Sequence, residues 1–586
     1  MNALWLCLLA LVWFVIGYHL YGRFIERTLV KPDDAHVTPA HAMNDGVDFV
    51  VGRRIYLWGN HFASIAGAGP IIGPIVAVSV FGWGPVFAWV LVGALFMGAV
   101  HDYLSLMISA RHRGAGIAEL AESLLGRTVR MVFALLLYIV LVLLIAVFMV
   151  SVAQAFINMP ALVVPTLGLI GIAVVMGLAM ERWHVPEVPA ATAAVAAAYF
   201  LIWVGYHLPV SLPSFWGDTV VLAAWCLVLT AYCLSASIAP MWLLLRPRDF
   251  ISSVKLVVGM LLGLAAIAVV QPTMSAPITS GGFVSHGKPL WPILFILVAC
   301  GAISGFHAIV STGTTARQLD RESDGRPIAF GGMLTEGLLA VVVIVVVSGG
   351  LTWGAAPVGV TGAAANLYFA TALKHSWIVA FGSGFGHLVG EMGIPLLTSS
   401  LAALLGAVMV KSFILTTLDA GTRLARFLVV ETLGEKVPVL RGHLAASLVV
   451  VLPALVIAVT NTYHEVWKLF GAANQLIASV ALVTISAYLA HDRLPKRYTL
   501  IPAVFMLATT VGALLWESFG GATGYLTSAT PDWPLGILAC VLVVLAAVIV
   551  AGGVKALARE GGWKPSFHWK SRTKTAERLG DHRLSM

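Results

Sequence analysis

The sequence predicts an all-α polytopic membrane protein with about 15–16 transmembrane helices, in a single domain over residues 1–554. Of its 586 residues, 59% are hydrophobic and only 11% are charged, whereas soluble domains carry about 25% charged residues. Apolar runs long enough to cross a hydrocarbon core of about 30 Å recur along the whole chain. The stretches between these runs are too short for a separate soluble domain.

Fifteen apolar runs are candidate spans. In chain order they cover residues 3–22, 58–80, 84–110, 129–157, 161–180, 189–206, 219–245, 250–270, 291–313, 331–351, 384–410, 443–462, 466–489, 499–515 and 535–553. The region 384–418 is long enough to contain a sixteenth span or a re-entrant segment. The first run has no basic residue before it and no small-residue cleavage site after it, so we expect a retained helix rather than a signal peptide.

The placement of the basic residues predicts the orientation. If the N-terminus is outside, only Lys288, Lys374 and Lys468 of the 35 Lys and Arg residues fall outside. The positive-inside rule expects this bias and places the C-terminus in the cytoplasm. Residues 555–586 then form a basic cytoplasmic tail that is solvated and can touch anionic membrane lipids. The net charge of +8 therefore indicates topology rather than binding of nucleic acid.

The second span contains several helix breakers, in the sequence GNHFASIAGAGPIIGP at residues 59–74. Irregular backbone survives at membrane depth only where it is buried in protein or lines a wet cavity. We therefore expect this helix to be interrupted near Gly67 and Gly69, and its freed peptide groups to bind substrate together with His61 and Ser64. The alternative is that the small residues only allow a neighbouring helix to approach closely.

A second interruption is predicted in the sequence CGAISGFHAIVSTGTTARQLD at residues 300–320. Ser304, His307, Ser311 and Thr314 recur at intervals of three and four, which places them on one helical face. In the topology above this span runs opposite to the first broken one, as an inverted repeat requires. We expect the stripe to contact substrate, and hydrogen bonding between helices is the alternative.

Two carboxylates inside apolar runs are candidates for carrying a coupling proton. Asp102 shares its helical face with Ser105 and Ser109, and Glu336 lies about one turn into its span. Ionisable groups at membrane depth are costly, so each is a functional candidate. The alternatives are a structural partner for a buried arginine in the case of Asp102, and an interfacial position for Glu336.

Other polar residues within the spans have gating or structural interpretations. His387 and Glu391 lie four residues apart, so they would meet on one helical face as an outer gate, a proton entry or a structural pair. Asp419 precedes Arg423 by four residues, which predicts an ion-paired collar at the inner end. Asn474 has either a role in hydrogen bonding between helices or a substrate-facing amide.

No enzyme or metal-site pattern is found in the sequence. Neither a His-Glu-x-x-His helix nor a Gly-x-Ser-x-Gly turn occurs. The five cysteines all fall inside apolar runs, and the 17 histidines are scattered. We therefore expect no metal, no organic cofactor and no catalytic residue. A channel, a sensor and a membrane-embedded enzyme remain remote alternatives to a transporter.

Several longer motifs resemble the carbon starvation protein A family of bacterial inner-membrane transporters. They follow the glycine- and proline-rich stretch in order and read GAVHDYLSLMISARHRGAGIAEL at 98–120, SGFHAIVSTGTTARQL at 304–319, MLTEG at 333–337, TTLDAGTRLARF at 416–427 and LFGAANQLIA at 469–478. The resemblance covers about 57–478. The family usually has two histidines where this chain has Asn60 and His61.

The resemblance implies secondary uptake of pyruvate by proton symport, with peptides as substrates of some members. It also implies a LeuT-like core of inverted repeats, with extra peripheral helices because six spans rather than four separate the two broken ones. Our hypothesis is uptake of pyruvate or a related small carboxylate. The alternative is a peptide or amino-acid importer, and sodium is left open as the coupling ion. The sequence does not predict an oligomeric state.

Overall fold

The computed structural model describes residues 1–46, 49–213, 215, 217–395, 397–434, 436–460, 463–521 and 524–558, without the side chains of 463–465. Most of the predicted tail, 559–586, lies outside these residues. Within them, thirteen helices are long and apolar enough to cross a membrane, and a bent helix pair makes up to fourteen spans. The prediction of an all-α polytopic membrane protein is confirmed.

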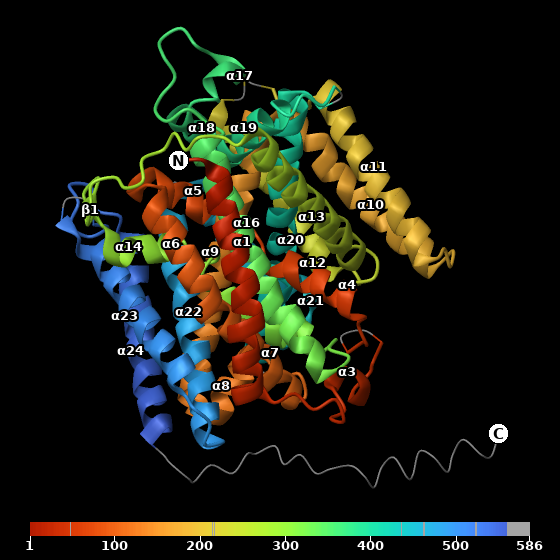
Figure 1. Ribbon diagram of the computed structural model, residues 1–586. Coiled ribbons are helices and arrows are strands. Elements are labelled where there is room, and N and C mark those ends of the chain that lie inside the picture. The colour runs from red at the N-terminus through yellow and green to blue at the C-terminus, as the bar shows by residue number, and fades with distance from the viewer. Residues whose placement is uncertain are drawn as a thin grey trace.

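The long helices lie side by side in one bundle (Figure 1). Their bounds are Ala3–Val30 (α1 to η2), Trp83–Arg111 (α6 to α7), Arg127–Asn158 (α9), Pro160–Glu181 (η4 and α10), Glu187–His207 (α11), Asp218–Ile238 (α12), Leu245–Val270 (α13), Glu322–Gly349 (η7 to α16), Ser399–Leu433 (α20), His443–Thr460 (α21), Val466–His491 (within α22, which begins at Tyr463), Arg497–Phe519 (α23) and Trp533–Ala558 (α24).

The two ends of the bundle differ in charge. The end drawn at the bottom of Figure 1, here called the basic face, holds Arg111 at the end of α7, Arg127 at the start of α9 and Arg497 at the start of α23. The opposite face holds the N-terminus and a two-stranded hairpin, β1 (Val284–Ser285) and β2 (Lys288–Pro289).

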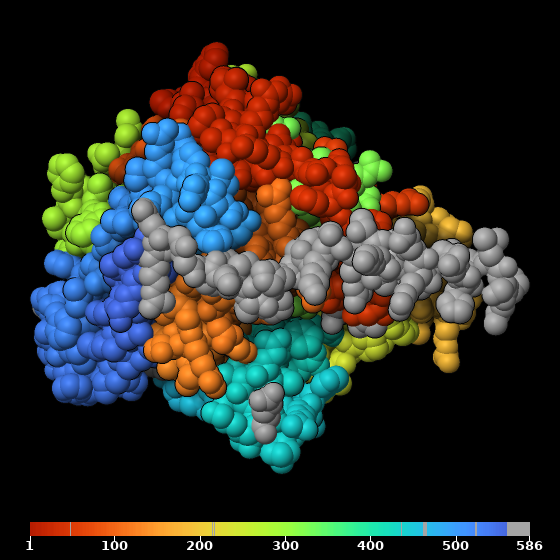
Figure 2. All heavy atoms as spheres, turned by 90° about the horizontal axis from the view of Figure 1, so that it is seen from below, coloured from red at the N-terminus to blue at the C-terminus, as the bar shows by residue number. Residues whose placement is uncertain are grey.

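Short helices cover the two faces. Their bounds are Pro39–Ala42 (α3) and Ile117–Leu125 (α8) toward the basic face, and Gly362–Ala365 (α17) and Phe369–His375 (α18) toward the opposite face. The space-filling view of Figure 2 looks onto the basic face, where the end of α8 and the beginning of α9 lie between the blue C-terminal helices and α20.

Burial separates an inner group of helices from an outer one. The apolar windows of α22, α20 and α16 are 94%, 83% and 83% buried, whereas those of α11, α21 and α24 are each 33% buried. An exposed apolar face on a helix of this length is expected for contact with lipid tails rather than water. The inner helices therefore surround any transport site, and the outer ones face lipid.

Two predicted spans are divided into shorter helices, and the described residues form thirteen or up to fourteen long spans where about 15–16 were predicted. The run 291–313 is divided into α14 (Leu290–Leu297) and α15 (Gly305–Val310), which continues as the π-helix η6 (Ser311–Thr315). The run 384–410 is divided between the short α19 (Trp377–Gly390) and the 35-residue α20. A Cβ on Gly386 would lie 2.5 Å from the carbonyl oxygen of Ser399, so α19 and α20 form a tight hairpin.

Candidate functional site

Both predicted helix interruptions are present. The first separates α4 (Arg54–Ile65) from α5 (Gly69–Phe81), which meet at a bend of 40°. The second comprises residues 298–304, between α14 and α15. Backbone groups freed at such breaks need partners from outside the helix, because an unpaired buried peptide group is costly.

The two broken helices run in opposite directions and touch at their breaks. A Cβ on Gly69 would lie 2.3 Å from the Sγ of Cys300, and one on Gly73 would lie 2.5 Å from the carbonyl oxygen of Leu297. The backbone of Gly52 bonds to Gln318 at the basic face. In these three contacts the residue number in the first broken helix rises while that in the second falls, so the predicted antiparallel arrangement is confirmed. Whether the repeats follow a LeuT-like plan stays a prediction.

Close packing explains two of the predicted site glycines. Gly69 lies against Cys300, and a Cβ on Gly67 would lie 2.5 Å from the Oγ1 of Thr417 on α20. These positions therefore need glycine for the approach of a neighbouring segment, which was the alternative interpretation of the sequence. Gly69 lets the two breaks meet, and Gly67 lets α20 approach the first break.

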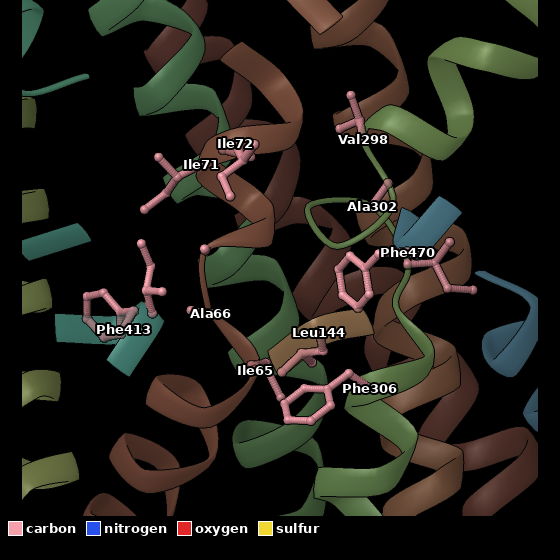
Figure 3. Close-up of a cluster of buried hydrophobic side chains, with 14 of the residues drawn as sticks. Ile65, Ala66, Ile71, Ile72, Leu144, Val298, Ala302, Phe306, Phe413 and Phe470 are labelled. Carbon is pink, nitrogen blue, oxygen red and sulfur yellow. The ribbon is translucent and has the colours of Figure 1, made fainter. Parts of the chain in front are cut away.

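Apolar side chains fill the space around the breaks (Figure 3). Ile65 and Ile71 from the first broken helix, and Ala302 and Phe306 from the second, are each at most 4% exposed. The figure also shows Ala66, Ile72, Leu144, Val298, Phe413 and Phe470 in the same cluster. This cluster, which we call the apolar plug, lies at the level of the breaks.

The polar centre of the molecule lies on the basic-face side of this plug. The His307 imidazole of α15 lies between two carboxylates, with Nδ1 2.9 Å from Oδ2 of Asp102 and Nε2 3.3 Å from Oε2 of Glu336. All three side chains have no exposed surface. The structure therefore joins a predicted substrate residue and both predicted proton carriers in one group, which we call the titratable cluster.

Two more histidines extend the titratable cluster. His101 places its Nδ1 2.8 Å from Oδ1 of Asp102, and His61 of α4 places its Nδ1 2.9 Å from the Thr315 hydroxyl. Sequence reasoning identified His61 but missed His101. Its signal was a second ionisable residue beside Asp102 in an apolar helix.

The remaining residues of the predicted substrate stripe have different surroundings. Ser304 accepts a hydrogen bond from the Asn474 amide at 3.0 Å, and Asn474 Oδ1 accepts one from the backbone N–H of Phe306 at 2.9 Å. Asn474 is therefore an interhelical cap for the start of α15. Ser311 is buried among the helices, whereas Ser64 donates to the Asn60 carbonyl of its own helix and does not join the titratable cluster.

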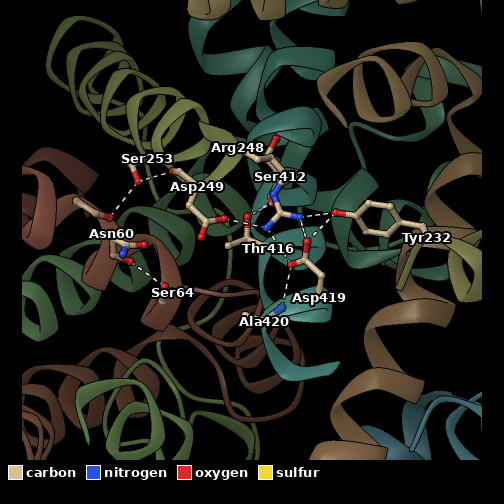
Figure 4. Close-up of polar contacts among 11 residues, drawn as sticks. Asn60, Ser64, Tyr232, Arg248, Asp249, Ser253, Ser412, Thr416, Asp419 and Ala420 are labelled. Carbon is tan, nitrogen blue, oxygen red and sulfur yellow. Dashed lines mark hydrogen bonds and ion pairs between the residues drawn. The ribbon is translucent and has the colours of Figure 1, made fainter. Parts of the chain in front are cut away.

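A buried ion pair links α13 and α20 (Figure 4). The Arg248 guanidinium donates to both carboxylate oxygens of Asp419, with one distance of 2.8 Å, and neither side chain is exposed. Tyr232 donates to the same carboxylate at 2.7 Å. Asp419 therefore pairs with Arg248 and not with Arg423, the partner that the sequence predicted. Arg423 donates to the carbonyl oxygens of Ala236 and Ala239.

Arg248 was missed because it precedes an apolar run and was assigned to the inner loop. The predicted His387–Glu391 contact does form, with 3.4 Å between Nε2 and Oε1. Those side chains are 39% and 48% exposed, so the pair belongs to the protein surface.

Two cavities lie on either side of the apolar plug. The larger has a volume of about 260 Å³ and lies toward the opposite face. Its lining residues are Ile72, Val76, Ser79, Val80, Val147, Lys288, Leu297, Leu373, Trp377, Trp467 and Lys468. Ile72 and Leu297 come from the two broken helices, so this cavity, which we call the outer cavity, reaches the breaks.

The smaller cavity, of about 160 Å³, lies at the basic face and is lined by His36, Val37, Thr38, Ala110, Arg111 and Glu322. The Arg111 guanidinium donates to Glu322 at 3.0 and 2.7 Å. Beside it, hydrogen bonds from Ser323 to the Asp34 carboxylate lower the pKa of Asp34 from its usual value. These contacts tie the loop after α15 to the N-terminal segment.

Among the described residues, no group of three or more His, Cys, Asp and Glu side chains is arranged to hold a metal ion. The five cysteines are free thiols.

A multi-helix membrane bundle with two antiparallel broken helices and an internal titratable cluster defines a polytopic transport protein rather than an enzyme. The family model described as carbon starvation protein CstA matches residues 2–513. The chain therefore belongs to the carbon starvation protein CstA family and is a membrane transporter of a small molecule.

Curated relatives agree with this assignment. The chain is 32% identical to a peptide transporter CstA of Mycobacterium tuberculosis, over 90% of this chain and 77% of the relative. It is 29% identical to the pyruvate/proton symporter BtsT of Escherichia coli, over 88% and 81% of the two chains. A manganese transporter of Eremococcus coleocola has a similar structure with a TM-score of 0.44, 11% identity and coverage of 89% and 99%.

Proposed function

We propose that this protein is a secondary active importer that moves a small carboxylate, such as pyruvate, together with a proton. The observation that carries the proposal is the position of His307 between two fully buried carboxylates, Asp102 and Glu336. Ionisable groups inside a membrane protein mark proton or substrate pathways. The similarity to a pyruvate/proton symporter supports the same reaction.

The charges of the titratable cluster explain how proton and anion uptake are linked. With Asp102 and Glu336 ionised and His307 protonated, the three groups carry a net charge of −1. Binding one proton on Glu336 makes them neutral and removes the repulsion toward an incoming anion. Moving a proton with a monoanion also cancels the opposition of the membrane potential, about 2.3 kcal/mol per charge per 100 mV.

The outer cavity is the proposed place of substrate entry. Its volume of about 260 Å³ lies near the lower end of ordinary ligand pockets, which suits a small acid better than a long peptide. Lys288 and Lys468 give the lining positive charge, with Lys468 also 3.5 Å from the Glu517 carboxylate. Trp377 and Trp467 offer apolar surface to the carbon atoms of the substrate. Rearrangement of the apolar plug would then pass the substrate between the broken helices.

We place the protein in the bacterial inner membrane, with the basic face in the cytoplasm. This orientation follows from the positive-inside rule. The outer cavity then faces the periplasmic side, as uptake requires.

The second candidate function is import of peptides, supported by the relatives named peptide transporter CstA. Uptake of labelled pyruvate into proteoliposomes, with competition by unlabelled lactate, alanine and dialanine, separates the two. Competition by pyruvate and lactate alone supports the carboxylate. Uptake of labelled dialanine in the same vesicles, without uptake of labelled pyruvate, supports the peptide.

The coupling ion is tested in the same vesicles. We expect an acidic exterior to stimulate wild-type uptake, and replacement of sodium by choline to leave it unchanged. Glu336→Gln removes the proton-binding carboxylate at nearly constant shape, so pH stimulation should disappear while substrate exchange persists. Unchanged pH stimulation in Glu336→Gln would refute this assignment, and dependence on sodium would refute proton coupling.

A further inference from the structure

Two neighbouring helices carry matching polar stripes that lead from the titratable cluster to the basic face. On α7, Asp102 is followed by Ser105 and Ser109, and on α15–η6, His307 is followed by Ser311 and Thr315. Intervals of three and four residues place each set on one helical face. Both helices run toward the basic face.

The stripes are in contact where they approach that face. The Ser109 hydroxyl donates to the backbone carbonyl of Thr312 at 3.2 Å, and the Thr312 hydroxyl accepts a hydrogen bond from the Ile117 amide at 3.1 Å. The stripes therefore form the two walls of one polar layer, which we call the seam.

Several buried polar atoms along the seam have no hydrogen-bond partner among the described residues. They are His61 Nε2, His101 Nε2, Ser105 Oγ and Ser311 Oγ. A Cβ on Gly332 would lie 3.7 Å from His61 Nε2, so His61 faces α16 one turn from Glu336. Buried polar groups are nearly always hydrogen-bonded, in many cases to ordered water. Their accumulation beside α7 and η6 indicates a hydrated layer.

The seam ends at the cavity in the basic face. Ala110, the residue after Ser109, lines that cavity together with Glu322 and His36. The His36 Nδ1 lies 3.4 Å from Glu322 Oε1, and its side chain is 57% exposed. The rise along α7 from Asp102 to Ala110 is only about 12 Å. Titratable groups therefore stand at both ends of the seam.

On the side of the titratable cluster away from the basic face, apolar side chains are closely packed. The apolar plug, with Ile65, Ile71, Phe306 and Phe413, packs around the two breaks (Figure 3), and its member Ile72 lines the outer cavity. A chain of hydrogen bonds cannot continue through such packing, whereas hydroxyl groups and water can relay a proton along the seam.

We propose that the seam is the path by which the coupling proton leaves the titratable cluster for the cytoplasm. At each step one O–H or N–H bond forms as another breaks, so that a proton leaving Glu336 or His307 appears on Glu322 or His36 and then in bulk water. His61, His101 and Asp102 face the start of the path, and Arg111 faces its end. This inference rests on the proposed proton coupling.

The test uses Ser105→Val in proteoliposomes that contain a pH-sensitive dye. Valine replaces the hydroxyl by one methyl group and adds a second, which dries the seam, and it has the shape of threonine without the hydroxyl. We expect net uptake with proton movement to fall about tenfold or more. Substrate exchange at equal pH should stay at the wild-type rate, because exchange does not require release of the proton. Ser105→Thr, which keeps the hydroxyl, should restore net uptake.

Ser151→Val is the matched control, since Ser151 is equally buried but donates to Val147 within its own helix α9. It should leave both rates unchanged. If Ser105→Val takes up substrate at the rate of the unchanged protein, or loses exchange and net uptake equally, the seam is not the proton path. If the unchanged protein takes up substrate without any proton movement, the proposed coupling itself is refuted, so the two failures are distinguishable.

Discussion

Arg248 of α13 and Asp419 of α20 form an ion pair in which neither side chain is exposed to solvent. Tyr232 hydrogen-bonds to the same carboxylate, and Asp249 lies 2.8 Å from the guanidinium. The group joins α12, α13 and α20 (Figure 4). Because the pair is fully buried, removing one of its charges tests how much the pair contributes to the stability of the bundle.

We expect Asp419→Ala to destabilise the folded protein by about 3–5 kcal/mol, because it leaves the Arg248 guanidinium buried beside a single carboxylate. The midpoint of thermal unfolding in detergent measures the effect. In Arg248→Met/Asp419→Leu both charges are removed, so part of the loss should be recovered. Glu391→Gln breaks the half-exposed pair with His387 and should cost less than about 1 kcal/mol. Equal effects of the two single changes would contradict the interpretation.

The contact between the two helix breaks predicts a rescue experiment. Gly69→Ala places a methyl group 2.3 Å from Cys300, an overpacking that costs about 1–3 kcal/mol. We expect lower stability and slower uptake, and Cys300→Gly in the same protein should restore both, because it removes the obstructing side chain. Gly171→Ala on α10 has open space around it and should be neutral. Failure of Cys300→Gly to rescue would show that the glycine serves backbone conformation instead.

Asn474 predicts a local effect on the second break. Asn474→Ala removes the acceptor of the Phe306 amide and the donor to Ser304, a loss of about 1–3 kcal/mol for buried groups left unpaired. Hydrogen–deuterium exchange should therefore accelerate in peptides that cover 300–310. Ser479→Ala is the control, since that hydroxyl bonds within its own helix. Unchanged exchange at 300–310 would mean that Asn474 does not hold the start of α15.

Cysteine labelling tests the predicted orientation of the bundle in the membrane. In a variant whose five native cysteines are replaced by alanine, we expect Lys374→Cys to react with a membrane-impermeant maleimide in intact cells. Arg182→Cys, at the basic-face end of α10, should react only after permeabilisation. The reverse pattern would refute the orientation given by the positive-inside rule.

Much of the architecture was predictable because local composition dictates it. Apolar length determines most of the spans, and the glycines and proline at 67–70 favour a break just before α5 begins at Gly69. Even the candidate groups Asp102, His307 and Glu336 were visible as single polar residues in apolar runs. The sequence alone thus determined the class of the fold, the positions of both breaks and most of the titratable cluster.

Tertiary structure decided which of these residues meet. Spacing along one helix made Arg423 the apparent partner of Asp419, yet the guanidinium that reaches Asp419 comes from α13, 171 residues earlier in the chain. The same limit applies to Gly69 and Cys300. Periodicity reports only neighbours on one helix, whereas contacts between helices depend on rotation and tilt set by the packing of the whole bundle.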